Sequence, residues 1–528
     1  MKKASTVLKF IFIVLFLAAS LAPLVLMPKY GNQEAESDDA DVFLPPLMVD
    51  GKVNKGFFLS AEGKFDGRFL ERTGDWFSKK FAFRREMVDA GDRIKADVFN
   101  TSGQAGVIVG KKGYLFYSDS FNDFLGRNEL SDYEIASMAY NIKLMQDQLE
   151  RKGIEFLFTI APNKNSLYPE LMPDKYDPDV DMRNRERLQP LIEQAGVHYK
   201  DLYPLFKNID QVMYLKGDSH WNNKGAAMVS DALMGALARP HQNRSRMKIS
   251  ERRDFTGDLY KMLYPASKPA DTQIYYDKYE PGEYNKRVKV RLIDDATGLL
   301  KKADLTKEPE WSASPEIKTR HLLKRRGTLL MIRDSFGNSL TPFIADEFKR
   351  ATFLNNTPYD IGRAVSEKRG TVIFETVERN LDRLIYDAPV IAAAGDTDRK
   401  TEKYLMGGAF ARKGITKGYG GSLACAVSDT QFGYLHLTGT LDPQMTPDDT
   451  DVYVKFLDER GRARLYKVYR TRREGKIEDR SDRANRYGIA AYIKDSDLDA
   501  GTYKLQLLYR KGKTWHKTRV LGTFDKEF

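Results

Sequence analysis

The feature that most constrains this fold is a repeated change of hydrophobic period between residues 131 and 384. Apolar runs of strand length are separated by segments in which apolar residues recur every three or four positions. The first pattern predicts buried strands, and the second predicts amphipathic helices packed on them. Their alternation predicts an α/β domain with a parallel sheet. The expected strands are 154–160, 197–202, 327–332, 351–354 and 371–375, and the expected helices are 132–151, 183–196, 226–237 and 340–347.

Two blocks within this pattern carry residues for acyl-transfer chemistry. Asp218 and His220 lie two positions apart, just before one expected helix, and Ser335 follows the expected strand 327–332. An Asp that orients a His, and a His that deprotonates a Ser, make a nucleophilic hydroxyl. We therefore expect Ser335 Oγ within about 2.6–3.2 Å of a His220 nitrogen, with Asp218 at the other nitrogen. Taken singly, a serine after a strand or a histidine in a loop is usually structural.

A tetrahedral intermediate on Ser335 would need hydrogen-bond donors for its oxyanion. The Ser335 main-chain N–H is one candidate, and the side chain of Asn163 or Asn338 could supply a second. Asn163 lies in the polar loop 161–166, at the carboxyl end of a strand, where open α/β sheets bind ligands.

Three further residues beside these blocks have two interpretations each. Lys164 and Arg333 are candidates for binding an anionic substrate, and structural roles are equally open to both. Trp221 could cover His220 or support the core, and we expect core support. Glu375 and Glu378 look like residues at a helix start, and we assign them no role.

The composition speaks against a metal or cofactor site. Cys425 is the only cysteine, and the six histidines are scattered, with no His pair at i, i+4. The formal net charge of +11 suits either a soluble basic surface or an anionic partner such as an acidic glycan or a phospholipid surface. No nucleic-acid-binding motif appears, so we expect no nucleic-acid partner.

The first 55 residues are organised as an anchor followed by a linker. Lysines at positions 2, 3 and 9 precede the apolar run Phe10–Met27, which is long enough to span a bilayer. Residues 1–30 therefore form the expected anchor, with the lysines in the cytoplasm and the rest of the chain outside. The alternative is a signal peptide cleaved near Ala18-Ala19-Ser20. Residues 31–46 are acidic and lack periodicity, and we expect a linker over residues 31–55.

Two domains are expected after the linker. Residues 56–388 form the α/β domain, with an insertion of irregular structure and short strands at about 241–325. Residues 389–528 contain several short alternating runs separated by turns, which predicts an all-β sandwich. Its aromatic residues either form a platform for stacking sugars or fill the sandwich core: Tyr434, Tyr466, Tyr469, Tyr487, Tyr492 and Trp515.

The region from Trp76 to about Leu384 resembles the polysaccharide O-acetyltransferase family that includes the alginate acetylation proteins. That family has an SGNH-hydrolase-like domain with an Asp-x-His-Trp signature, which is Asp218–Trp221 here. The stretch Arg333–Gly337, with the sequence Arg-Asp-Ser-Phe-Gly, resembles the nucleophile block. Ordinary SGNH hydrolases carry the serine before the Asp/His pair. The permuted order seen here is similar to that of the alginate-type family.

The resemblance implies transfer of acetyl groups, through a Ser335 acyl-enzyme, onto hydroxyls of an exported polysaccharide. It further implies a membrane-bound O-acyltransferase as acetyl donor, and a location at the outer, periplasmic face of a bacterial inner membrane. Family members that bind alginate carry a carbohydrate-binding module at the C-terminus, so the sandwich could bind glycan. Two alternatives stay open: an acetylesterase that uses the same triad, and a non-catalytic glycan-binding scaffold.

Overall fold

The computed structural model describes residues 14, 48–49, 52–53, 83–99, 101–176, 178, 182–207, 209–266, 271–293, 299–307, 312–323, 325–393, 421–428, 433–441, 451–472, 487–511 and 514–527. Apart from Val14, the predicted anchor of residues 1–30 lies outside these ranges, as does most of the predicted linker. None of the helices within the described ranges has the length and apolar character needed to cross a bilayer.

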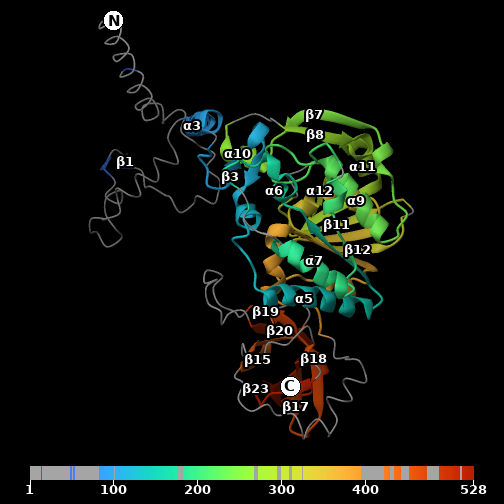
Figure 1. Ribbon diagram of the computed structural model, residues 1–528. Helices are drawn as coiled ribbons and strands as arrows, with labels where there is room; N and C mark the ends of the chain where they lie inside the picture. Colours follow the sequence, from blue (N-terminus) through green and yellow to red (C-terminus); the bar gives the residue numbers. More distant parts are fainter. Residues whose placement is uncertain are drawn as a thin grey trace. The chain divides into compact units, whose positions relative to one another are not determined.

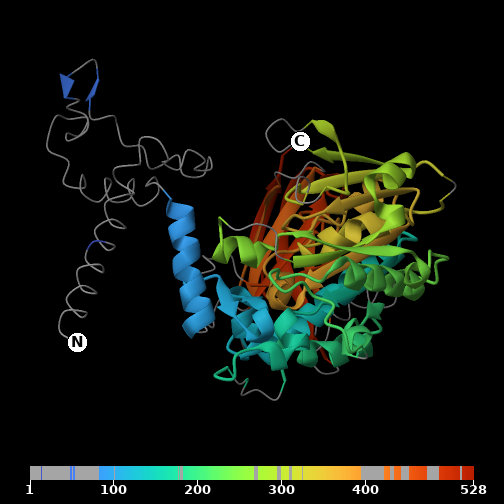
Figure 2. The ribbon, with the colours of Figure 1, turned by 90° about the horizontal axis from the view of Figure 1, so that it is seen from above.

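The chain divides into two compact units, the first of which comprises residues 1–109 and 258–269. Its α3 (Arg84–Phe99) is a single straight helix, drawn in blue in Figure 2. Arg93 on α3 donates a hydrogen bond to the Tyr260 hydroxyl at 3.4 Å. Its guanidinium also lies 4.6 Å from the centre of the Tyr264 ring. The other described elements of this unit are β1 (Met48–Val49), β2 (Lys52–Val53), β3 (Val107–Val109) and α10 (Asp258–Leu263).

The second unit, residues 110–257 and 270–528, is built on an eight-stranded sheet with the order β10-β9-β11-β13-β12-β14-β5-β6. Its strands are β5 (Glu155–Ala161), β6 (Tyr199–Lys200), β9 (Val288–Ile293), β10 (Leu300–Ala303), β11 (Glu316–His321), β12 (Thr328–Ile332), β13 (Arg350–Leu354) and β14 (Thr371–Val377). The five strands from β13 to β6 pair in parallel, which confirms the strands predicted there. The other three pair antiparallel, so the sheet is mixed and the prediction of a parallel sheet was wrong for this half.

The insertion at about 241–325, for which we predicted irregular structure and short strands, contributes the short strands β9, β10 and β11 to this sheet. Val288, Val290 and Leu292 of β9 are buried and alternate with exposed Lys289 and Arg291. This is the period of a half-buried strand, and its cationic outward positions obscure the pattern in the sequence. The insertion also contains the hairpin of β7 (Ile249–Phe255) and β8 (Asp271–Tyr276), as well as η6 (Arg244–Arg246), η7 (Asp277–Tyr279) and α11 (Pro281–Arg287).

Helices cover both faces of the sheet (Figure 1). On one face, α5 (Asp132–Glu150) and α7 (Asn184–Gln194) share a buried apolar core with residues of β5, β12 and β14. Ser131 caps α5 through a reciprocal pair of hydrogen bonds with Glu134. On the other face lie α9 (Asn223–Ala236) and α12 (Phe336–Ala345), which contact each other. The short helical elements that matter below are α4 (Phe121–Phe124), α6 (Lys164–Leu167), α8 (Tyr203–Lys207), α13 (Arg363–Ser366) and η8 (Glu378–Ile385).

The C-terminal region forms two antiparallel sheets around one apolar core, as the strand pattern predicted. One sheet has the order β15-β16-β20-β19, and the other has β18-β17-β21-β22 with β23 added to β21. The strands are β15 (Gly421–Val427), β16 (Tyr434–Leu441), β17 (Val452–Asp458), β18 (Ala463–Lys467), β19 (Tyr469–Thr471), β20 (Gly488–Lys494), β21 (Gly501–Lys511), β22 (Thr514–Lys517) and β23 (Gly522–Lys526).

This sandwich is docked on helix α5 by hydrogen bonds between buried groups. The Asn141 side chain donates to the carbonyls of Leu384 and Arg470 at 2.9 and 2.8 Å, and it accepts from the Arg470 N–H at 3.0 Å. The Tyr469 hydroxyl donates to Gln148 Oε1 at 2.6 Å. Of the aromatic residues considered for a stacking platform, Tyr466, Tyr469 and Tyr492 are buried, which leaves them as core and interface residues.

Candidate active site

Asp218 and His220 lie on a tight loop that the backbone closes before α9. Tyr214 and Trp221 form an antiparallel bridge, and the N–H groups of Leu215 and Asn222 donate to the carbonyls of His220 and Met213. Asn222 then caps α9 by accepting the Gly225 N–H at 2.9 Å. The loop is therefore held at both ends, which fixes the direction of the His220 side chain.

The three residues proposed from the sequence as a triad converge. His220 Nε2 lies 2.8 Å from Ser335 Oγ, and His220 Nδ1 lies 2.7 Å from Asp218 Oδ1. Both distances fall in the range expected for a nucleophile–base–carboxylate chain. Asp218 also accepts the His220 main-chain N–H at 2.9 Å, so it binds both the ring and the main chain of His220. Ser219, which the sequence analysis passed over, brings its hydroxyl within 3.2 Å of His220 Nδ1.

Ser335 lies at the turn between β12 and α12, in the parallel half of the sheet. Strand β12 pairs with β13 on one side and β14 on the other, so its end is held on both edges. The next main-chain N–H, that of Phe336, is taken by Asp334 Oδ1 at 2.8 Å. It is therefore not free for an oxyanion, and the N–H of Ser335 itself is the nearest main-chain candidate.

A cluster of aromatic side chains packs against the His220 imidazole. Trp221 is fully buried and stacks on Phe206, with ring centres 6.1 Å apart. Phe336 packs edge-on against Trp221 at 4.9 Å and against His220 at 4.8 Å. Trp221 thus lies in the core, as expected, and Phe336 contacts both Trp221 and the imidazole.

Lys164 does not face a substrate site. Its side chain is 4% exposed, and Nζ donates to the carbonyls of Leu115 and Leu215 at 2.6 and 2.8 Å. A longer contact of 3.3 Å reaches the carbonyl of Lys216. The ammonium therefore ties β4 (Leu115–Tyr117) to the loop that leads into Asp218. Of the two roles left open by the sequence, the structure favours the structural one.

Asn163 is completely buried among charged groups. Its Nδ2 donates to Asp123 Oδ2 at 2.8 Å, and its main-chain N–H donates to Glu378 Oε2 at 3.1 Å. Burial, together with the charge of Glu378, raises the pKa of Asp123 to about 8. These contacts leave at most one amide hydrogen of Asn163 for an oxyanion.

Arg333 and Asn338 bind each other beneath the first turn of α12. Arg333 is 2% exposed; one of its terminal nitrogens donates to Asn338 Oδ1 and the other donates to the Ser314 carbonyl at 3.0 Å. The Asn338 main-chain N–H donates to the Ser335 carbonyl at 3.1 Å. Arg333 therefore stabilises the turn that bears Ser335, which is the structural alternative.

The part of the chain that contains Asp218 and His220 matches a known family. A family model described as the SGNH hydrolase-like domain of acetyltransferase AlgX matches residues 107–307. A protein of Pseudomonas syringae pv. tomato, named probable alginate O-acetylase AlgJ, is 23% identical over 269 residues, which are 49% of this chain and 66% of that protein. The alginate biosynthesis protein AlgX of Pseudomonas aeruginosa is 32% identical over 90 residues, which are 16% of this chain and 19% of that protein.

Residues 107–307 are therefore similar to the SGNH hydrolase-like domain of AlgX. The resemblance inferred from the sequence motifs is thereby confirmed. The alignments span less than two thirds of the length of these relatives. Among solved structures, Bacillus cereus PatB1 aligns with a TM-score of 0.41 and 18% identity, over 53% of this chain and 99% of that one.

Arg379 is a residue near the candidate triad that the sequence analysis missed. It is half-buried, and its guanidinium lies 5.5 Å from the centre of the Phe336 ring and 5.3 Å from that of Tyr117. It also donates to Asn163 Oδ1 at 3.2 Å. The available signal was its place just after the expected strand 371–375, because the carboxyl ends of parallel strands meet at one edge. Because the neighbouring Phe336 packs on His220, this guanidinium is a candidate for binding an anionic group of a substrate.

Glu375 is the second missed residue, and it is buried directly behind Ser335. The Asp334 main-chain N–H donates to Glu375 Oε2 at 3.1 Å. Burial, followed by the negative charge of Asp334, raises the pKa of Glu375 far above its usual range. This carboxyl group therefore favours its neutral form.

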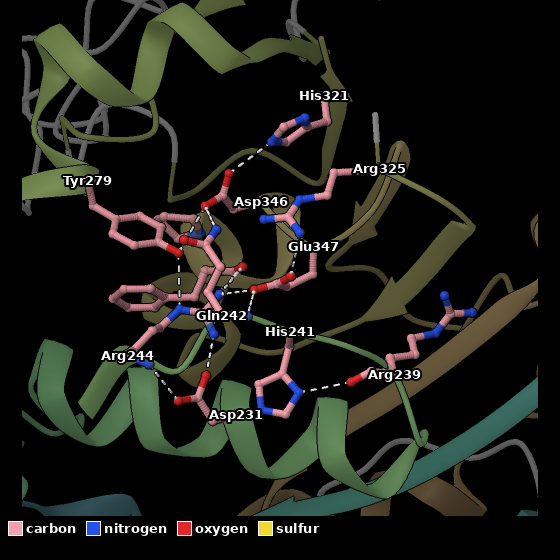
Figure 3. Close-up of polar contacts among 12 residues, drawn as sticks. Asp231, Arg239, His241, Gln242, Arg244, Tyr279, His321, Arg325, Asp346 and Glu347 are labelled. Atoms are coloured by element: carbon pink, nitrogen blue, oxygen red, sulfur yellow. Dashed lines mark hydrogen bonds and ion pairs between the residues drawn. The ribbon is translucent and has the colours of Figure 1, made fainter. Parts of the chain in front are cut away.

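The opposite end of α12 is fixed by the network of polar contacts drawn in Figure 3. Asp346, just after the helix, accepts hydrogen bonds from Gln242 at 2.7 Å, from His321 at 3.0 Å and from Arg287 at 2.7 Å. Burial alone would raise the pKa of Asp346, but the hydrogen bonds and positive charge of His321 and Arg287 hold it well below its usual range. The insertion is thus tied to the helix that begins at Ser335.

Arg244 extends this network to a second carboxylate and to the end of the helix. It is 1% exposed, donates to Glu347 Oε1 at 2.7 Å and pairs with Asp231 on α9. Arg244 also donates to the Phe343 carbonyl at 2.9 Å, so it satisfies one of the last carbonyls of α12.

Proposed function

We propose that this protein is a serine-dependent O-acetyltransferase that moves acetyl groups onto hydroxyls of an exported polysaccharide. The observation that carries the proposal is the continuous chain from Asp218 Oδ1 through both nitrogens of His220 to Ser335 Oγ, with contacts of 2.7 and 2.8 Å. The names of the relatives, which are probable alginate O-acetylases, support a polysaccharide acceptor.

In the first half-reaction, Ser335 Oγ attacks the carbonyl carbon of an acetyl donor while His220 Nε2 takes the hydroxyl proton. The Oγ–C bond forms, and the carbonyl oxygen becomes an oxyanion facing the Ser335 N–H. Asp218 stabilises the imidazolium and keeps its Nδ1 proton in place. The intermediate collapses when the donor's leaving group departs with the proton from Nε2, which leaves an acetyl ester on Ser335.

In the second half-reaction, a polysaccharide hydroxyl enters where the leaving group departed. Neutral His220 takes its proton as the hydroxyl oxygen attacks the acetyl carbon. Collapse breaks the Oγ–C bond, and the proton returns from Nε2 to Ser335. Water in place of the sugar hydroxyl would give hydrolysis by the same steps, so the choice of acceptor distinguishes a transferase from an acetylesterase.

The acyl-enzyme is tested by incubating the protein with p-nitrophenyl acetate and weighing the peptide that contains Ser335. We expect one acetyl group on that serine, and in Ser335→Ala we expect no adduct and at least about a 1,000-fold loss of turnover. Ser339→Ala, which removes a hydroxyl one turn further along α12, is the matched control and should label normally. Normal turnover in Ser335→Ala would exclude the covalent mechanism.

Addition of an oligosaccharide acceptor to the same reaction separates the two possible outcomes of the second step. A transferase yields acetylated oligosaccharide at the expense of free acetate, whereas an esterase yields the same acetate with or without acceptor. Labelling of Ser335 with no acceptor product from any polysaccharide would leave the esterase as the function.

The proposal includes attachment to the inner membrane through Phe10–Met27, with the catalytic domain on the periplasmic side and a membrane-bound O-acyltransferase as the donor. The apolar run and its N-terminal lysines support this orientation. A short tether would hold Ser335 near the exit of such a donor at an effective concentration in the mM range. Replacing residues 1–30 by a cleavable signal should therefore reduce polymer acetylation in cells. Undiminished acetylation would show that attachment is unnecessary.

A further inference from the structure

The turn that bears Ser335 is fixed by a single carboxylate that binds both sides of it. Asp334 Oδ1 accepts the N–H of Phe336 at 2.8 Å, and Asp334 Oδ2 accepts the N–H of Val377 at 2.5 Å. Phe336 begins α12, and Val377 ends the neighbouring strand β14. Asp334 therefore ties the start of the nucleophile helix to the end of an adjacent strand, and Ser335 lies between Asp334 and Phe336.

Glu375 is the group that holds Asp334 from behind. It is 1% exposed, and its Oε2 accepts the Asp334 main-chain N–H at 3.1 Å. On β14 it alternates with Phe374, whose side chain joins the core on the α5 face, so Glu375 faces α12. A Cβ at Gly337 would lie 2.9 Å from Glu375 Oε2, which shows how closely the first turn of α12 rests on this carboxyl group.

We propose that Glu375 is a positioning residue for Ser335: it binds Asp334 and thereby fixes the turn between β12 and α12 on which the nucleophile lies. The proposal rests on Ser335 being the nucleophile of the proposed function. Glu375 acts through Asp334 and takes no part in the bond changes.

Glu375 carries a proton in this proposal, because burial and the nearby negative charge of Asp334 disfavour its ionised form. Asp334 is half-buried and accepts the N–H groups of Phe336 and Val377 through its two carboxylate oxygens. A side-chain hydrogen bond with Asp334 contributes to the raised pKa of Glu375, after burial and the Asp334 charge. On ionisation of Glu375 the two charges would repel, and the Asp334 contacts to Phe336 and Val377 would lengthen.

Other charged and titratable groups surround Glu375, and they define the competing explanations. The positive charge of Arg333 lowers the pKa of Glu375. The charge of Glu375 in turn contributes to the raised pKa values of Tyr214 and Tyr359, after burial. Asp123, near the same edge of the sheet, has a pKa of about 8 and would also titrate at alkaline pH. A test of Glu375 must therefore separate it from Asp123.

The test is the rate of Ser335 acetylation by p-nitrophenyl acetate between about pH 5 and 10, measured in wild type and in Glu375→Gln. A glutamine keeps the size of the side chain and supplies an N–H donor that does not titrate. We expect the wild-type rate to fall on the alkaline side, and Glu375→Gln to keep most of the plateau rate while losing this fall. Glu375→Ala, which removes the contact, should lower the rate about 10- to 100-fold at every pH, as expected for a misplaced reacting group.

Two further variants serve as controls. Glu347→Gln removes another buried carboxylate, located just beyond the opposite end of α12, and should leave the pH profile unchanged. Asp123→Asn should also leave the alkaline fall in place. A fall that persists in Glu375→Gln, or that disappears in Asp123→Asn, would overturn the proposal.

Hydrogen–deuterium exchange gives a second readout that does not depend on turnover. In wild type, peptides containing Phe336 and Val377 should lose protection beyond the intrinsic pH effect where Glu375 ionises, while the same peptides in Glu375→Gln should not. Unchanged protection in wild type would overturn the proposal even if the rate falls. If Glu375→Gln does not fold, wild-type exchange and Glu375→Ala still decide. Absence of Ser335 labelling at every pH would instead count against the proposed function.

Discussion

The two ends of helix α12 bury carboxyl groups in opposite ways. At the N-terminal end, Glu375 meets a second carboxyl group, that of Asp334, and its pKa rises far above the usual range. At the C-terminal end, Asp346 meets His321 and Arg287, and its pKa lies well below the usual range. Both carboxyl groups are 1% exposed or less, so burial alone does not explain the difference. The partners decide whether each buried group carries a proton or a charge.

Under the proposed function, this difference separates catalysis from stability along one helix. The C-terminal end carries cations, which suit the negative end of a helix dipole and bind its last carbonyls. That end fastens the insertion to the sheet. The N-terminal end carries a carboxyl pair that depends on a proton, next to the serine that must be aligned with His220. We therefore expect changes at the C-terminal end to alter folding, and changes at the N-terminal end to alter the rate and its pH dependence.

The largest effect on stability is expected from Asp346→Ala. This change leaves Arg287 and His321 facing a buried site without their carboxylate, and breaking a buried charge pair costs about 3–5 kcal/mol. Urea unfolding should show that loss, while the acetylation rate per folded molecule should stay near wild type. Glu283→Ala, which breaks an exposed pair with Lys286, is the matched control and should leave stability almost unchanged. A large loss of acetylation rate in folded Asp346→Ala would contradict the assignment of stability to the C-terminal end of α12 and of rate to its N-terminal end.

The pH dependence of unfolding should differ in sign between the two ends. The pKa of Asp346 in the folded protein is below its unfolded value of about 3.9, so its stabilisation is present above pH 4 and is lost as the pH falls. The pKa of Glu375 in the folded protein is above its unfolded value of about 4.3, so its stabilisation is complete below that pH and is lost as the pH rises through the folded pKa. Wild type should therefore lose stability relative to Glu375→Gln as the pH rises. A difference that is independent of pH would contradict the assignment of a proton to Glu375.

The sequence was sufficient to predict the parallel half of the sheet and the convergence of Asp218, His220 and Ser335. Both predictions rest on a local signal, because the carboxyl ends of neighbouring parallel strands meet at one edge whatever the rest of the chain does. The antiparallel half was missed because the outward positions of β9 are Lys289 and Arg291, which make the segment look like a charged loop. In a strand with one solvated face, such residues are expected.

The supporting residues could not be assigned from sequence, since their roles depend on distant partners. For Lys164 the sequence left anion binding and a structural role equally open, and its Nζ binds carbonyls that lie 49 residues before it and 51 residues after it. Glu375 looked like a residue at a helix start, and its role depends on Asp334, 41 positions earlier. Tyr469 and Tyr492 were candidates for either a sugar-stacking platform or the core, and both are buried in the core that includes residues of α5. Tertiary contacts of this kind have no periodic signature.

The smallest expected effect comes from adding one methyl group at the N-terminal end of α12. In Gly337→Ala the new Cβ would lie 2.5 Å from Arg333 Cβ and 2.9 Å from Glu375 Oε2, so the first turn must move away from the carboxyl pair. Such overpacking costs about 1–3 kcal/mol. In Gly235→Ala, near the end of α9, the new Cβ meets no atom within 4 Å, and the higher helix propensity of alanine should stabilise the protein by up to about 1 kcal/mol. If the N-terminal end sets the alignment of Ser335, Gly337→Ala should also lower the acetylation rate, whereas Gly235→Ala should not. Equal rates in the two variants, with the stability loss confined to Gly337→Ala, would mean that the packing behind Ser335 supports the fold but does not position the nucleophile.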